Sequence, residues 1–203
     1  MTRATAGMDG HLAYYLDKGI SPVRYDNSEL GAHLRIRDSL YRALGLPAVA
    51  FKSSRVLEIA PGSGRNSLYI ATSMPAAYDL VEPNPVGIAD IRALYGTLDL
   101  PHTAPTLHEM RFQDFAATQG YDIVICENWL GGLAHERALI SKLAGLVAPG
   151  GVLVLTMVPP VASRPPSSAS CFRFAYLIAM RISRARLSSL SRSSARSSPR
   201  SPA

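Results

Sequence analysis

A short apolar run that leads directly into a glycine turn constrains the fold of this chain more than any other segment. Val56, Leu57 and Ile59 form the apolar, partly β-branched run that is typical of an interior parallel strand. Gly62 and Gly64 then allow a sharp backbone turn, and the residues after them suit the first turn of a helix. The segment therefore predicts a strand, a tight turn and a helix in direct succession.

The same alternation of strand and helix continues along the chain. Apolar runs predict five strands, at about 55–59, 78–82, 106–111, 121–126 and 152–157. Strands that are separated by helical segments predict βαβ units, right-handed crossovers and a mostly parallel sheet. We therefore expect an α/β fold with a Rossmann-like, doubly wound sheet.

Composition divides the 203 residues into three predicted regions. Residues 1–46 are expected to form a helical N-terminal segment, and residues 47–158 the α/β domain. Residues 159–203 contain eight Arg, thirteen Ser and six Pro but no Lys, Asp or Glu. The rest of the chain carries 13 basic and 15 acidic groups, so the net charge of +6 originates in the tail. The basic charge is thus no indication that the globular part binds nucleic acid.

Two classes of nucleotide-like cofactor compete for the glycine turn. A nicotinamide or flavin site has the pattern G-x-G-x-x-G, but Ser67 stands where the third glycine is expected. An S-adenosylmethionine site has an acidic residue at the end of the preceding strand, and Glu58 occupies that position. These two features favour S-adenosylmethionine, while an NAD-dependent oxidoreductase remains an alternative.

The order of the motifs along residues 50–158 resembles the class I S-adenosylmethionine-dependent methyltransferase family. The first motif runs from Glu58 to Gly64, with Ala60 in the first glycine position. Glu82, at the end of the second predicted strand, matches the acidic residue that holds the ribose hydroxyls in this family. A carboxylate suits that task because it can accept two hydrogen bonds from a diol.

The resemblance also implies roles for individual residues. The implied cofactor contacts are Glu58, Ala60, Gly62, Gly64, Asn66, Glu82, Asp114 and Glu127. Within this set Asp114 would border the adenine, and Arg65 or Asn66 would reach the carboxylate of the cofactor. Glu127 and His135 are the candidate catalytic residues, as general bases for an acceptor that must lose a proton. The sequence has no His or Cys cluster that predicts a metal site.

By the same resemblance, the reaction is an in-line methyl transfer to a small molecule or a sugar. The N-terminal segment would then cover the acceptor side of the site. Its candidate lining residues are Tyr14, Tyr15, Arg24 and Tyr25. A helix that merely packs over the sheet edge explains these residues equally well.

The sheet of this family continues past the fifth strand with two further strands, which we do not find in residues 159–203. We therefore expect the last two strands to be missing and a strand edge to be left unpaired. Three explanations are open: a truncation or shifted reading frame after Val158, a functional basic tail, or a divergent ending that still packs. A truncated chain would be a non-catalytic remnant with a partial cofactor pocket.

The cysteines and the N-terminus bear on the compartment of the protein. Cys126 and Cys171 lie in apolar contexts, which favours a reducing environment. The first residues lack the apolar core of a secretory signal, and no apolar run is long enough to span a bilayer. We therefore expect a cytoplasmic protein.

Overall fold

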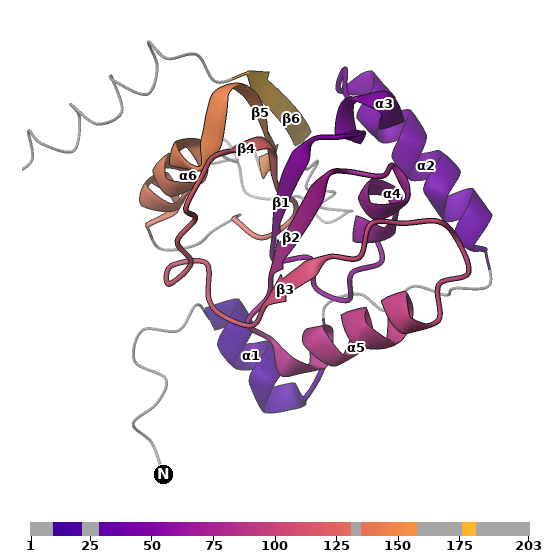
Figure 1. The fold of residues 1–203 in the computed structure, drawn as a ribbon. Helices are drawn as coiled ribbons and strands as arrows, with labels where there is room; N and C mark the ends of the chain where they lie inside the picture. The colour runs from indigo at the N-terminus through magenta and orange to yellow at the C-terminus, as the bar shows by residue number, and fades with distance from the viewer. Residues whose placement is uncertain (1–9, 22–28, 131–134, 158–175, 182–203) are drawn as a thin grey trace, which may run out of the picture.

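The computed structural model describes residues 10–21, 29–130, 135–157 and 176–181. Six helices and six strands lie within these ranges (Figure 1). In chain order they are α1 (Gly10–Lys18), α2 (Leu30–Ala43), α3 (Ala48–Phe51), β1 (Arg55–Ile59), α4 (Ser67–Thr72), β2 (Ala77–Val81), α5 (Pro85–Gly96), β3 (Thr106–His108), β4 (Tyr121–Cys126), α6 (Glu136–Gly145), β5 (Val147–Met157) and β6 (Tyr176–Arg181).

The described strands form a single sheet in the order β3-β2-β1-β4-β5-β6. The first five strands run parallel, and β6 pairs antiparallel with β5 at one edge. The order reverses next to β1, because the chain moves outward through β2 and β3 and then returns to β4 on the other side of β1. This is the doubly wound, Rossmann-like arrangement that the strand and helix pattern predicts.

One part of the fold prediction is wrong. We expected no strand after the fifth and an unpaired edge on that strand, but β6 pairs with β5 from Val152–Arg181 to Met157–Tyr176. The sequence of β6, Tyr176 to Arg181, has no polar alternation that would identify it as a strand between Arg- and Ser-rich segments. The rest of the region 159–203 lies outside the described residues, so its predicted character stays a prediction.

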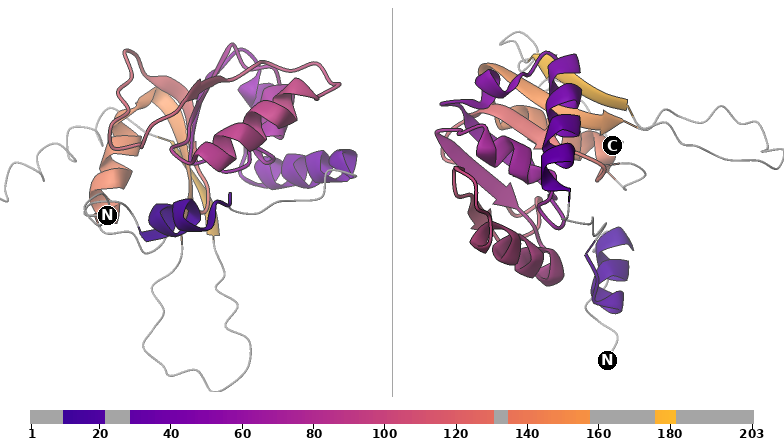
Figure 2. Two further views of the ribbon diagram at one scale, coloured as in Figure 1. Left: turned by 90° about the horizontal axis from the view of Figure 1, so that it is seen from below. Right: turned by 90° about the vertical axis from the view of Figure 1, so that its right-hand side faces the viewer.

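The sheet is the middle of three layers, which Figure 2 shows in its left view. Helices α2, α3, α4 and α5 cover one face, and α6 covers the other (Figure 1). Tyr41, Phe51 and Tyr69 pack in the core of the first face together with alternate residues of the strands. Phe112 and Phe115, from the connection between β3 and β4, fill the core of the second face beside α6. That connection contains no helix, so its aromatic side chains take the place of one.

Local sequence explains where the helix after β2 begins. Asn84 is the N-cap of α5: its side-chain oxygen accepts a hydrogen bond from the backbone N–H of Val86. Pro85 occupies the first helical position, where its missing N–H has no cost. The amide of Asn84 also donates to the carbonyl oxygen of Ile20, at 2.9 Å, directly after α1. This contact places the end of α1 at the carboxyl ends of the parallel strands.

Candidate functional site

Three acidic or turn-forming positions meet where β1, β2 and β4 end. Ile59 is in register with Val81 on one side and with Cys126 on the other. The next residues along the three strands, Ala60, Glu82 and Glu127, are therefore lateral neighbours about 5 Å apart in strand spacing. In an open α/β sheet this edge, beside the point where strand order reverses, is where ligands bind.

The structure has the sharp turn that Gly62 and Gly64 predict, and three residues of the glycine turn, Ala60–Gly64, have a left-handed backbone. The φ angles are 56° at Ala60, 61° at Gly62 and 76° at Gly64. A side chain at Gly64 would place its Cβ 2.7 Å from Ile91 of α5. A Cβ on Gly87 would lie 2.6 Å from the carbonyl oxygen of Gly62. The turn is thus compact because glycines on both sides let α5 approach its backbone.

Glu82 holds the glycine turn in place. One carboxylate oxygen accepts the backbone N–H of Gly62, and the other accepts that of Asn84, both at 2.9 Å. Only 5% of Glu82 is exposed, and this burial raises the pKa of its carboxyl to about 7. The predicted cofactor residue therefore lies beside the turn, and each of its oxygens keeps a lone pair for a further donor.

Glu58 lies deeper than the other acidic residues. It is 4% exposed, and the hydroxyl of Tyr78 on β2 donates a short hydrogen bond to its carboxylate. Burial raises the pKa of Glu58 to about 7, although the Tyr78 hydrogen bond acts against this. Its side chain therefore points into the layer under α4, on the face opposite to α6.

Glu127 is bound by two side chains of α2. Arg37 donates to its Oε1 at 2.5 Å, and the hydroxyl of Tyr41 donates to the same oxygen at 2.6 Å. Arg37 also donates to the Tyr41 oxygen, at 3.2 Å. Both charged side chains are 8% exposed, so this is a buried ion pair. Burial acts to lower the pKa of Arg37, but Tyr41 and Glu127 raise it above its ordinary value.

The remaining predicted residues are less closely associated with the turn. Asn66 is half-buried and precedes α4 without a side-chain capping bond. Asp114 is exposed and forms an ion pair with Arg111 at 3.2 Å. His135 is exposed and has a left-handed backbone at the start of α6. The structure does not bring Asp114 or His135 into contact with Glu82 or Glu127, and their roles stay predictions.

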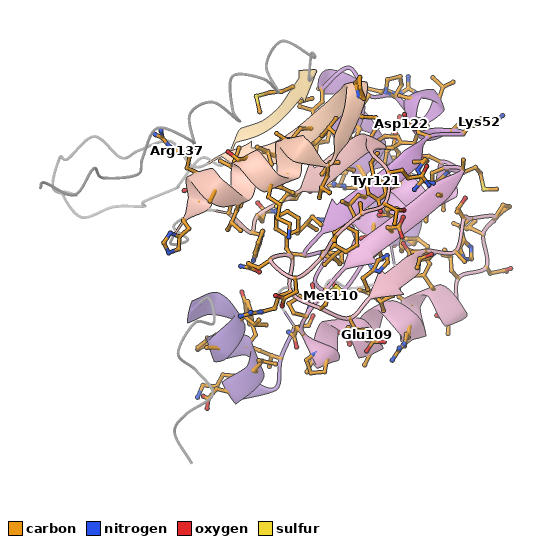
Figure 3. The ribbon with its side chains drawn as sticks, turned by 60° about the vertical axis from the view of Figure 1, so that its left-hand side comes forward. Lys52, Glu109, Met110, Tyr121, Asp122 and Arg137 are labelled. Carbon is orange, nitrogen blue, oxygen red and sulfur yellow. The ribbon has the colours of Figure 1, made fainter. Side chains whose placement is uncertain are left out.

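The predicted acceptor side is described only in part. Tyr14 on α1 is exposed, whereas Tyr15 is half-buried, and their rings meet edge to face. Arg24 and Tyr25 lie outside the described residues. Figure 3 shows Glu109 and Met110, which follow β3, on the side of the sheet toward α1, and Tyr121, at the start of β4, farther from α1. The helix α1 thus lies on the same side of the molecule as the strand ends that carry the site.

Sequence reasoning missed three residues of this site. Arg37 and Tyr41 are separated from Glu127 by 90 and 86 residues, and only their spacing of four within a helix indicates a shared face. Asn84 is the third, and its local signal is an Asn before a proline that starts a helix, which is a recognisable N-cap.

Two of the predicted absences concern metals and membranes. Within the described ranges, no group of three or more His, Cys, Asp or Glu side chains could hold a metal ion. None of the helices there is both long and apolar enough to cross a bilayer. Cys126 is a buried free thiol, and the cytoplasmic location stays a prediction.

Three solved methyltransferase structures align with this one at low sequence identity, and the first two named below share its fold. Magnesium protoporphyrin IX methyltransferase from Synechocystis PCC 6803 aligns with a TM-score of 0.56 and 17% identity, over 92% of this chain and 86% of its own. Coclaurine N-methyltransferase aligns with a TM-score of 0.53 and 14% identity, over 68% of this chain and 40% of its own. An amino pentose methyltransferase from Micromonospora echinaspora aligns with a TM-score of 0.47 and 20% identity, over 66% of this chain and 56% of its own. The chain thus spans less than two thirds of the length of the last two proteins.

Two comparisons of the sequence gave different results. No curated protein matches the chain. Residues 31–187, however, match the family described as Methyltransferase domain, from α2 to beyond the end of β6. Because this match covers most of the sequence, the chain belongs to the methyltransferase domain family.

Proposed function

We propose that the chain is an S-adenosylmethionine-dependent methyltransferase whose cofactor binds where β1, β2 and β4 end. The observation that carries the proposal is the glycine turn, which Glu82 fixes by accepting the backbone N–H of Gly62. A turn of this kind, fixed before a ligand arrives, does not have to be ordered by the ligand. Membership of the methyltransferase domain family supports the same reaction class.

The residues at this edge fit the cofactor. The turn from Ala60 to Gly64 gives a ligand close access to peptide groups, since two of its residues have no Cβ. Glu82 retains acceptor capacity for the two ribose hydroxyls while it holds the turn. Glu127 follows β4 and lies beside Ala60, which follows the neighbouring strand β1. Its carboxylate supplies negative charge for the methionine portion of the cofactor. When bound, S-adenosylmethionine supplies a methyl group that its sulfonium centre already activates.

The contribution of the protein is then mainly alignment. Holding two reactants in line supplies roughly 7–11 kcal/mol of the barrier, without a further catalytic group. Where the acceptor must lose a proton, we assign the general base to His135 in preference to Glu127. Two hydrogen bonds already converge on Glu127 Oε1, whereas the His135 imidazole is exposed.

We further propose a small organic molecule as the methyl acceptor. Two structures of the same fold are named for such substrates: one is a magnesium protoporphyrin IX methyltransferase, and the other is bound to N-methylheliamine. The exposed aromatic side of α1 lies near the strand ends and offers apolar surface for such a molecule.

Calorimetric titration tests the cofactor assignment. The full chain should bind S-adenosylmethionine and S-adenosylhomocysteine, and it should not bind NAD. Glu82→Ala should weaken binding at least tenfold, since it removes both the ribose acceptor and the support of the turn. Glu109→Ala, at the exposed end of β3, is the matched control and should bind as the unmodified chain does. Binding of NAD alone would refute the proposal.

A further inference from the structure

A polar stripe runs along the face of α2 that meets the site. His33, Arg37 and Tyr41 follow one another at intervals of four residues, so they lie on one side of the helix. Arg37 and Tyr41 are buried and contact Glu127. The pKa of His33 is lowered by burial and by the charges of Arg65, in the segment after the glycine turn, and of Arg37. The stripe therefore follows the carboxyl edge of the sheet from Arg65 to Glu127.

Two side chains of the stripe bind the same oxygen atom of Glu127. Arg37 and Tyr41 both donate to Oε1 of Glu127, and they are themselves hydrogen-bonded to each other. The three side chains thus close a triangle, which leaves the Glu127 carboxylate little freedom to rotate. A carboxylate has about four lone-pair sites, so two donors on Oε1 leave acceptor capacity for a ligand.

Aromatic contacts with α3 and α4 also hold α2 in place. The Tyr41 ring already stacks on that of Tyr69, with centroids 5.4 Å apart, and meets the edge of Phe51 at 5.2 Å. Such aromatic contacts stabilise a helix on a sheet without any desolvation of charge. A buried ion pair, by contrast, costs desolvation energy that its Coulomb attraction often only balances. The Arg37–Glu127 ion pair is therefore better explained by a role in fixing the orientation of the Glu127 carboxylate than by a role in stabilising α2.

We propose that Arg37 and Tyr41 are positioning residues: they fix the Glu127 carboxylate beside the glycine turn, where it faces the positively charged part of the cofactor. The inference rests on the function proposed above and adds two residues from outside the sheet to the site. Neither residue is assigned contact with the cofactor, because both act through Glu127.

A double-mutant cycle on cofactor binding tests this role. The affinities of the full chain for S-adenosylmethionine and S-adenosylhomocysteine are measured by calorimetry for Tyr41→Phe, Glu127→Ala and the double variant. Tyr41→Phe keeps the stacked ring and removes only the hydroxyl donor, so the fold should be retained. Arg37→Lys provides a second, independent change of the same carboxylate. Arg42→Gln, which breaks an exposed ion pair with Asp38 on the same helix, is the control.

We expect Tyr41→Phe to weaken S-adenosylmethionine binding about tenfold, the equivalent of 1.4 kcal/mol, when Glu127 is present. In the Glu127→Ala background the same change should have no effect, because the side chain through which Tyr41 acts is absent. An equal loss in both backgrounds, or a lowered melting temperature with unchanged affinity, would overturn the positioning role alone. If the unmodified chain binds neither cofactor form, the proposed function falls and this inference falls with it.

Discussion

Replacement of Glu58 by Gln should make the stability of the fold less dependent on pH. Glu58 is buried under α4, and the Tyr78 hydroxyl donates to it. Gln has nearly the same shape as Glu, and its amide oxygen can accept the same hydrogen bond. The substitution therefore removes the titration of this site while it leaves the packing nearly unchanged.

The size of the effect follows from the pKa. Burial raises the pKa of Glu58 from 4.5 to about 7 in the folded state. Between these pH values the folded chain holds a proton that the unfolded chain has released, so stability falls as pH rises. Below pH 4.5 the contribution is fully present, and above pH 7 it is lost. At 1.36 kcal/mol for each pH unit, Glu58 accounts for a decrease of about 3 kcal/mol across this window.

Urea unfolding at pH 5, 6, 7 and 8 measures this decrease directly. Burial also raises the pKa of Glu82 to about 7, so the unmodified chain should show the combined slope of two such groups. Glu58→Gln should remove about half of that slope, and its stability should exceed that of the unmodified chain most clearly at pH 8. Glu109→Gln, on an exposed side chain, is the control. An unchanged slope for Glu58→Gln between pH 5 and 7 would refute the reasoning.

Three further predictions concern the backbone around the site, and urea unfolding tests each of them. Ala60→Gly should raise the free energy of unfolding by up to about 1 kcal/mol, because it relieves a left-handed alanine; a decrease would contradict the strain. Gly87→Ala should lower both stability and S-adenosylhomocysteine affinity, since its Cβ would collide with the Gly62 carbonyl oxygen. Gly96→Ala on the same helix, where a Cβ meets nothing within 4 Å, should lower neither. Lys142→Met should cost about 1 kcal/mol, because Lys142 donates to two carbonyl oxygens of the β3–β4 connection, and an unchanged stability would show that water replaces it.

The sheet and its glycine turn could be predicted because their determinants are local. The apolar run of β1 and the glycines after it specify a strand and a turn within ten residues, and the structure has both. Glu82 could be placed at the site for a similar reason, since it is the last residue of a predicted strand. Its bond to the backbone N–H of Gly62 could not be predicted, because it depends on how the turn folds back over β2.

The part of the site that comes from α2 could not be predicted, because it depends on tertiary contacts. Arg37 lies on a helix with an ordinary mixture of polar and apolar residues, and nothing near it in sequence identifies an acidic partner. Its pairing with Glu127 arises only when α2 packs against the end of β4. Strand β6 was missed for the opposite reason: its neighbours in sequence resemble a tail, whereas its pairing with β5 decides its structure.

The antiparallel strand at the edge of the sheet also has a consequence during synthesis. Chain elongation takes on the order of seconds to proceed from the end of β5 at Met157 to the end of β6 at Arg181. Strand β5 leaves the ribosome earlier than β6 by about the same interval, and until β6 arrives its free edge exposes backbone N–H and C=O groups as a template for another strand. Slower initiation or a lower temperature of expression, which keeps such chains apart, should therefore raise the soluble yield of this protein.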